Sequence, residues 1–218
     1  MKLFLASAFD QVAELFEKRV QKLKGKKVIF IENPADIYNN DKWWVKLDRE
    51  AFIRLGSIVI NVDLRDIAMD EFKKILAEAD IIHICGGSVF YTMSLLKEKG
   101  FDKIIADFVK ENKLIYTGTS AGSMIVADNL SLDSHDPDEK QFVEKLKDFL
   151  GLGLVNFLII PHANNKDFTD NNIEIIKNLT KFSQPVIFLY DTQAVLVENS
   201  KIEIIGGNSI DAETVKPD

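Results

Sequence analysis

The stretch KLIYTGTSAGSMIVA at residues 113–127 decides the fold class that we expect for this chain. An apolar run with β-branched residues leads through a group of small residues into a second apolar run. Because the first run is continuous rather than alternating, it suits a strand that is buried on both faces. The stretch therefore predicts a buried strand that turns sharply into a helix.

Similar apolar runs recur on both sides of this stretch, at residues 2–7, 27–31, 57–62, 80–85, 157–161 and 185–190. Several of the segments between them carry apolar residues three and four positions apart, as amphipathic helices do. Strand alternating with helix predicts an α/β fold, a doubly wound, mostly parallel sheet with helices on both faces. At the C-terminal end, AVLV at 194–197 and KIEII at 201–205 predict a hairpin at one edge of the sheet.

Composition narrows the class of protein. The chain has 218 residues, of which 46% are hydrophobic and 28% charged, as in ordinary soluble globular proteins. A net charge of −7 is opposite to that of proteins that bind phosphate backbones, so we expect no nucleic acid partner. No apolar run is long enough for a signal-peptide core or a membrane span, so we expect no membrane partner. The single cysteine, Cys85, fits a reducing compartment and predicts a cytoplasmic protein.

Residues that follow apolar runs are the candidate site residues, because ligands of open α/β sheets bind outside the carboxyl ends of the strands. Residues 118–122 read G-T-S-A-G and match the G-x-S-x-G nucleophile elbow, in which a strand turns sharply into a helix. Ser120 would be the nucleophile, and the helix N-terminus would favour a developing oxyanion. A tight turn without catalysis gives the same five residues, so this alternative stays open.

A serine hydroxyl needs a neighbouring base, and the chain has three histidines. His162 is the preferred base because it follows an apolar run and a proline. His83 lies inside an apolar run and is expected in the core, while His135 lies in an acidic stretch and is expected in solvent.

The imidazole in turn needs a carboxylate on its other nitrogen. Asp191, at the end of a later apolar run, is the leading candidate, with Asp133 and Asp136 as alternatives. The order serine, histidine, acid differs from the order serine, acid, histidine of α/β-hydrolases. The chain shows no spaced set of His and Cys ligands, and we expect neither a metal nor another cofactor.

A second turn of small residues, Gly86 and Gly87, follows the run at 80–85. The backbone N–H groups of Gly87 and of Ala121, the residue after the nucleophile, are the natural pair of donors for an oxyanion. Trp43 and Trp44 have two interpretations: they could line a pocket, or they could pack a helix against the sheet.

Four segments together resemble peptidase family S51, the dipeptidase E and cyanophycinase group: GGSVF (86–90), GTSAGS (118–123), IIPH (159–162) and LYDTQAVLV (189–197). The resemblance spans most of the chain. It implies a flavodoxin-like fold similar to class I glutamine amidotransferases, with serine in place of the amidotransferase cysteine. It places the family's nucleophile, base and acid on Ser120, His162 and Asp191, and its oxyanion donors on Gly87 and Ala121. Because the length allows one large core and the sequence shows no domain boundary, we expect a single α/β hydrolytic domain over residues 1–218.

The resemblance also implies a substrate class, namely short peptides with an N-terminal aspartate or, in the cyanophycinase branch, a β-aspartyl arginine polymer. We expect substrate contacts from Ser88, Asn164 and Lys166, with Lys166 as the point charge that an aspartyl substrate would need.

The chain departs from the family at the GGNTF turn, which reads GGSVF here, and at Asp191, where dipeptidase E usually has glutamate. Two alternatives remain: a non-peptide amidase or esterase with the same triad, and a non-catalytic binding protein. We expect a monomer or a homodimer.

Overall fold

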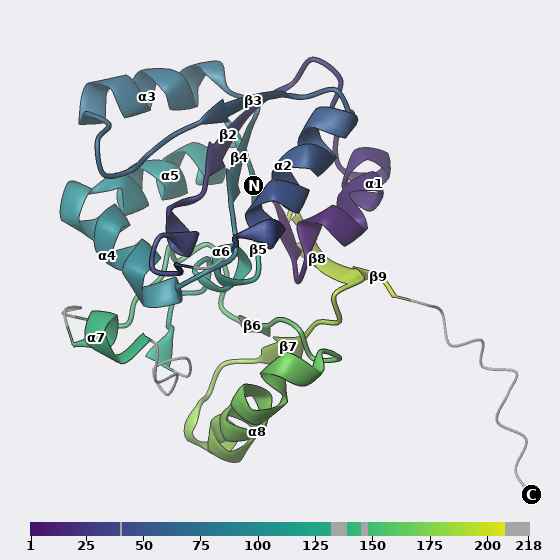
Figure 1. Ribbon diagram of the computed structural model, residues 1–218, viewed down its shortest axis with the longest axis vertical. Helices are drawn as coiled ribbons and strands as arrows, with labels where there is room; N and C mark the ends of the chain where they lie inside the picture. Colours follow the sequence, from purple (N-terminus) through teal and green to yellow (C-terminus); the bar gives the residue numbers. More distant parts are fainter. Residues whose placement is uncertain (40, 132–138, 145–147, 208–218) are drawn as a thin grey trace, which may run out of the picture.

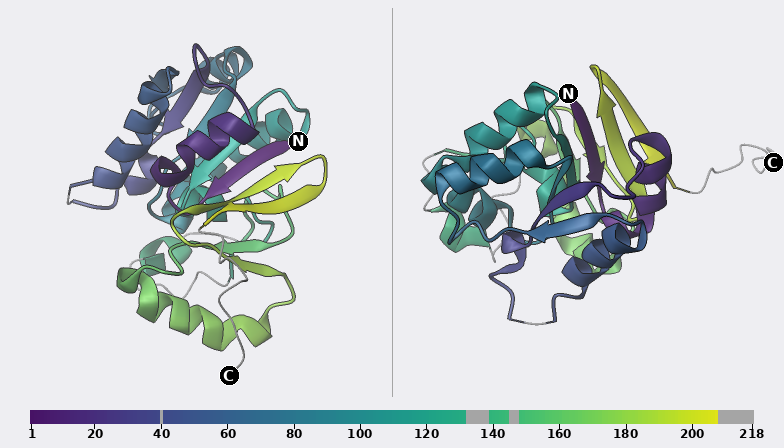
Figure 2. Two further views of the ribbon diagram at one scale, coloured as in Figure 1. Left: turned by 90° about the vertical axis from the view of Figure 1, so that its right-hand side faces the viewer. Right: turned by 90° about the horizontal axis from the view of Figure 1, so that it is seen from above.

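The computed structural model describes residues 1–39, 41–131, 139–144 and 148–207. Its main sheet is made of β1 (Lys2–Ala6), β2 (Lys27–Ile31), β3 (Ile58–Asn61), β4 (Ile81–Ile84), β5 (Ile115–Thr119), β8 (Gln193–Glu198) and β9 (Lys201–Gly206). The strand order is β3-β2-β4-β5-β1-β8-β9. Strands β1 to β5 run parallel, while β8 is antiparallel to both β1 and β9. The predicted parallel sheet and its C-terminal edge hairpin are both confirmed, and Figure 2 shows the hairpin beside β1.

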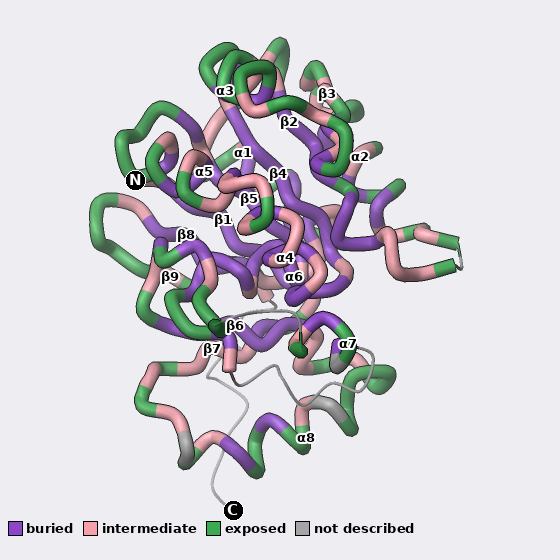
Figure 3. The backbone as a smooth tube through the Cα atoms, turned by 90° about the vertical axis from the view of Figure 1, so that its left-hand side faces the viewer, coloured by how far each residue is buried: buried purple, intermediate pink, exposed green. Residues whose placement is uncertain are grey.

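Helices cover both faces of this sheet (Figure 1). One layer contains α1 (Phe9–Arg19) and α2 (Trp43–Arg54), and the other contains α3 (Met69–Glu78), α4 (Val89–Lys99) and α5 (Phe101–Lys110). Side chains of the central strands alternate between the two cores: Phe4 and Phe30 pack with α1 and α2, while Leu5 and Ile29 pack with the other layer. The continuous apolar runs of the central strands β1, β2, β4 and β5 are therefore explained by burial on both faces (Figure 3), whereas the run at 57–62 forms the edge strand β3 and is partly exposed.

A second, smaller sheet was not predicted. The apolar runs at 157–161 and 185–190 form β6 (Leu158–Ile160) and β7 (Val186–Phe188), which pair in parallel with each other and not with the main sheet. The edge of β1 that faces away from β5 is occupied by β8, so no edge beside β1 remains for β6. With α8 (Thr169–Asn178), this pair lies at the carboxyl end of the main sheet (Figure 1).

Two short helices complete the described elements that surround the site. Helix α6 (Ala121–Met124) follows β5 directly, and α7 (Lys140–Val143) contacts α4. Among the described residues, no helix combines the length and the apolar character needed to cross a membrane.

Candidate active site

Ser120 lies at a sharp turn between β5 and α6. Its backbone has φ 49° and ψ −115°, a conformation that non-glycine residues rarely adopt. A Cβ atom on Gly118 would lie 2.4 Å from the backbone of Gly122, and one on Gly122 would lie 2.0 Å from the carbonyl oxygen of Ile84. Both glycines of the G-x-S-x-G pattern are thus required by close backbone packing, and the strained turn presents the serine at the carboxyl edge of the sheet.

Three segments that are far apart in the sequence bring Ser120, His162 and Asp191 together. Ser120 Oγ lies 3.0 Å from His162 Nε2, and His162 Nδ1 lies 2.6 Å from Asp191 Oδ1. The side chains of His162 and Asp191 are only 14% and 17% exposed. When Nδ1–H donates to the carboxylate, Nε2 is free to accept the serine proton, which is the geometry that nucleophilic catalysis by serine requires.

Electrostatics keep the Asp191 carboxyl ionised. The hydrogen bond from His162 lowers the pKa of Asp191 below its usual range, and this outweighs the opposing effect of burial. The hydroxyl of Ser7 lowers this pKa further. The alternative acids Asp133 and Asp136, and His135 with them, lie outside the described residues.

Ser7, at the end of β1, is a part of the site that the sequence analysis missed. Its hydroxyl accepts the backbone N–H of His162 at 2.8 Å and donates to Asp191 Oδ1 at 2.9 Å. His162 itself has a positive φ of 59°, so this anchor holds an uncommon backbone conformation. Ser7 ends the apolar run at 2–7, and the rule that singled out the other strand ends would also have found it.

Asn164, an expected substrate contact, has a partner inside the protein. Its side-chain oxygen accepts the backbone N–H of Asp191 at 3.0 Å. This contact places Asn164 beside the triad acid and holds the backbone there.

The N–H groups of Gly87 and Ala121 were expected to bind an oxyanion. No residue in the described part of the chain accepts a hydrogen bond from either group. Gly87 has φ 153°, and a Cβ atom there would lie 2.1 Å from the carbonyl oxygen of Pro34. Only glycine allows the turn to approach Pro34 this closely, and Ser88 N–H then donates to the same oxygen at 2.8 Å.

The expected substrate contact through the Ser88 hydroxyl does not fit the structure. Ser88 is fully buried and forms the N-cap of α4, where its side chain accepts the N–H of Tyr91. Its hydroxyl donates to Glu139 at 2.6 Å, and that carboxylate also accepts the N–H groups of Val89 and Phe90. A carboxylate at a helix N-terminus is favourable, so this serine serves the start of α4.

Lys166, the expected point charge, is exposed and begins the short 3-10 helix Lys166–Phe168. The last residue of that turn, Phe168, stacks on the His162 ring with a centroid distance of 4.3 Å and an interplanar angle of 21°. The turn that carries Lys166 therefore lies against the candidate base. Phe168 was not anticipated, because nothing in its local sequence marks a ring contact.

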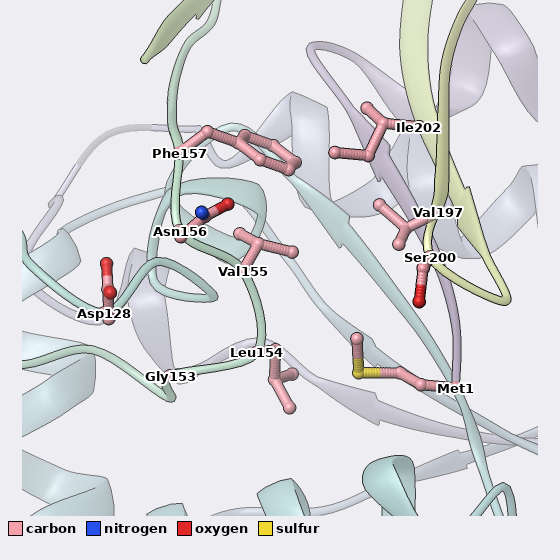
Figure 4. A pocket seen from close by; sticks show the side chains of 10 residues that line it. All are labelled: Met1, Asp128, Gly153, Leu154, Val155, Asn156, Phe157, Val197, Ser200 and Ile202. Atoms are coloured by element: carbon pink, nitrogen blue, oxygen red, sulfur yellow. The ribbon is translucent and has the colours of Figure 1, made fainter. Parts of the chain in front are cut away.

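The structure also contains a cavity of about 410 Å³, shown in Figure 4. It is lined by Met1, Asp128, Gly153, Leu154, Val155, Asn156, Phe157, Val197, Ser200 and Ile202. Met1 precedes β1 whereas Ser7 follows it, so the cavity and the triad side chains lie toward opposite ends of that strand. Among the described residues, no group of three or more His, Cys, Asp and Glu side chains could hold a metal ion.

Comparison with known proteins gives the family. A family model described as peptidase family S51 matches residues 3–205. The uncharacterized peptidase Lin0382 of Listeria innocua is 31% identical over 201 residues, which cover 92% of this chain and 94% of that protein. The uncharacterized peptidase PM1590 of Pasteurella multocida is also 31% identical, over 95% of this chain and 98% of its own.

A solved structure agrees with this match. The crystal structure of a "Putative Peptidase E Protein" from Listeria monocytogenes superposes with a TM-score of 0.85 at 28% identity and covers 94% of this chain and 98% of that one. The fold and these likenesses define a hydrolase of a serine peptidase family. The chain belongs to peptidase family S51, as the resemblance of its motifs predicted.

Proposed function

We propose that residues 1–218 act as one hydrolytic domain that cleaves short peptides through a Ser120–His162–Asp191 triad and an acyl-enzyme. The observation that carries this proposal is the unbroken hydrogen-bonded path from Ser120 Oγ through the imidazole to the carboxylate, at 3.0 Å and 2.6 Å. The N–H groups of Gly87 and Ala121, for which the described residues offer no acceptor, support it independently. Ala121 directly follows Ser120, and Gly86, the neighbour of Gly87, packs close to Ser120.

Acylation begins when His162 Nε2 takes the Ser120 proton while Oγ forms a bond to the scissile carbonyl carbon. The carbonyl oxygen becomes an oxyanion, which the N–H groups of Gly87 and Ala121 stabilise. Collapse of this tetrahedral intermediate breaks the C–N bond, and the imidazolium gives its proton to the leaving amine. Asp191 remains ionised and stabilises the imidazolium throughout.

Deacylation repeats these steps with water. His162 takes a proton from the water molecule as its oxygen bonds to the acyl carbon, and the same donors hold the second oxyanion. Collapse then breaks the ester bond to Oγ, and the proton returns to Ser120. The products are an amine and a carboxylic acid, and the enzyme is regenerated.

The finer part of the proposal is a preference for an N-terminal aspartate. Lys166 supports it, because this exposed cation is on the short turn whose Phe168 ring stacks on His162. A single ammonium would attract an aspartyl carboxylate without bidentate geometry. We further propose that the protein works in the cytoplasm as a monomer or homodimer.

The test is chromatographic detection of cleavage across Asp-Xaa, other Xaa-Xaa and β-aspartyl dipeptides, with Ser120→Ala as the inactive control. The proposal requires cleavage by the wild type that the variant loses. Lys166→Ala should then reduce the Asp-Xaa preference, while Lys177→Ala, a surface lysine on α8 paired with Glu174, should not. Cleavage of simple esters without any dipeptide would contradict the peptidase assignment and favour an esterase.

A further inference from the structure

Trp44, in the first turn of α2, reaches across to the small-residue turn after β4. Its indole Nε1–H donates to the carbonyl oxygen of Gly86 at 3.0 Å. The two residues are 42 positions apart, so the contact joins the start of α2 to the turn that carries Gly87. Cys85 Sγ also donates to this oxygen at 3.3 Å, but a thiol is a weak donor.

This hydrogen bond fixes the peptide group that joins Gly86 to Gly87. In a planar trans peptide the C=O and the N–H point in opposite directions. When the indole holds the carbonyl oxygen on one side, the Gly87 N–H must point to the other side. That N–H is one of the two donors for which the described residues offer no acceptor.

Packing brings the indole and the nucleophile close to Gly86. A Cβ atom on Gly86 would lie 3.3 Å from Ser120 Cβ and 3.5 Å from Trp44 Cδ1. Because glycine has no Cβ atom, Ser120 and the indole both approach Gly86 closely. The peptide that the indole holds through the hydrogen bond is therefore next to the nucleophile.

The indole is itself held in place. Its ring meets Tyr38 edge to face, with a centroid distance of 5.7 Å and an interplanar angle of 90°. One turn further along α2, the buried Asp48 accepts the N–H of Asp10 at 3.1 Å and pairs with His83 Nε2 at 3.3 Å. His83 is fully buried and bonds to Thr117 of β5 at 2.6 Å, so α2 is pinned to the sheet below Trp44.

We infer that Trp44 is a positioning residue that aims the Gly87 N–H at the oxyanion. The inference rests on the proposed function, because the oxyanion forms only if Ser120 attacks a carbonyl. Trp44 acts through Gly87, so its loss should weaken transition-state binding and leave ground-state binding of the substrate intact.

The test compares Trp44→Phe with Trp43→Phe, using a dipeptide that the wild type cleaves. Phenylalanine keeps an aromatic ring but has no N–H. Trp43 is the matched control, since it neighbours Trp44 in the sequence, is 60% exposed and donates no hydrogen bond to a described residue. Its ring meets the Trp44 ring edge to face at 5.9 Å, and a phenylalanine ring keeps an aromatic contact there. Removing one oxyanion donor outright typically costs about 10²–10³ in kcat. Loosening one should cost less, about three- to tenfold, which corresponds to one ordinary hydrogen bond.

A second readout separates positioning from mere packing. A peptide boronic acid mimics the tetrahedral intermediate, so its inhibition constant should rise in Trp44→Phe by the same factor as kcat falls, with KM within twofold. Replacement of Trp44 by 3-benzothienylalanine, which exchanges only the ring N–H for sulfur, should reproduce this effect if phenylalanine disturbs folding. Trp43→Phe should change each value by less than twofold.

Two failures are distinguishable. If Ser120→Ala abolishes cleavage but the Trp44 variants keep kcat and boronate affinity within twofold of wild type, the positioning inference is wrong and the proposed function stands. A change in KM alone would also overturn the inference. If Ser120→Ala cleaves as fast as the wild type, the proposed function fails and the inference fails with it.

Discussion

Replacing Ser7 by alanine removes one hydroxyl that holds two members of the proposed triad. Ser7 is fully buried, its oxygen accepts the His162 N–H at 2.8 Å, and its proton goes to Asp191 Oδ1 at 2.9 Å. A buried N–H left without an acceptor costs about 1–3 kcal/mol, and a hydrogen bond to a charged group contributes about 1.5–3 kcal/mol. Since both losses fall on one site, which can relax, we expect the free energy of unfolding to fall by about 2–4 kcal/mol.

For a chain of this length, 1 kcal/mol corresponds to about 2–4 °C in Tm, so Ser7→Ala should melt roughly 4–16 °C below the wild type. The assay is thermal unfolding followed by circular dichroism at pH 7, with kcat measured on the same preparation. We expect kcat to fall about tenfold, because the imidazole and its acid lose a shared anchor.

Ser94→Ala is the matched control, since this partly buried serine donates only to the carbonyl oxygen of Phe90 within α4. It should stay within about 2–3 °C of the wild type, with unchanged kcat. A Ser7→Ala protein that also melts within 2 °C of wild type and keeps kcat within twofold would refute the reasoning.

The remaining predictions concern three other positions. The pKa of Asp191 is lowered in the folded protein. Its carboxylate therefore stabilises the fold at pH values above the ordinary carboxyl pKa of about 3.9, and it loses this effect as the pH falls through the lower pKa of the folded protein. The Tm advantage of wild type over Asp191→Asn should thus be present at pH 5 and shrink as the pH falls below 4; an advantage independent of pH would contradict this. Gly87→Ala forces a Cβ atom to 2.1 Å from the Pro34 carbonyl oxygen and should lower Tm by roughly 6–12 °C, the equivalent of about 3 kcal/mol, and abolish turnover, whereas wild-type behaviour in both assays would refute the close packing. Glu139→Gln replaces a carboxylate that accepts three hydrogen bonds at the start of α4, and urea unfolding should show a loss of about 1–3 kcal/mol; an unchanged midpoint would show that this cap contributes nothing.

The parallel character of the main sheet and its C-terminal hairpin follow from features that a sequence displays locally. Continuous apolar runs require burial on both faces, and the short AVLV–KIEII connection leaves a hairpin as the simplest solution. The separate β6–β7 sheet was not predictable in this way. Its strands have the same apolar character as the others, and the place beside β1 is taken by β8, which follows them in the sequence.

The candidate site was likewise predictable from the sequence only in part. Ser120, His162 and Asp191 each follow an apolar run, so the rule for parallel sheets singles them out as candidates without knowledge of distances. It does not explain why they meet, because the runs before His162 and Asp191 form the second sheet. Ser88 also follows such a run, but its partner Glu139 is 51 residues away, and only the folded chain reveals that the hydroxyl is buried. Trp44 was left with two interpretations for the same reason, since its hydrogen bond to Gly86 depends on how α2 lies against the sheet.

The most direct test of the central claim is covalent labelling of the nucleophile. The protein is incubated with a fluorophosphonate, and the adduct is located by mass spectrometry of proteolytic peptides. The account predicts one adduct per chain, on the peptide that contains Ser120, and none in a folded Ser120→Ala protein. An adduct of equal yield in that variant, or the absence of any adduct on a folded wild-type protein, would contradict it.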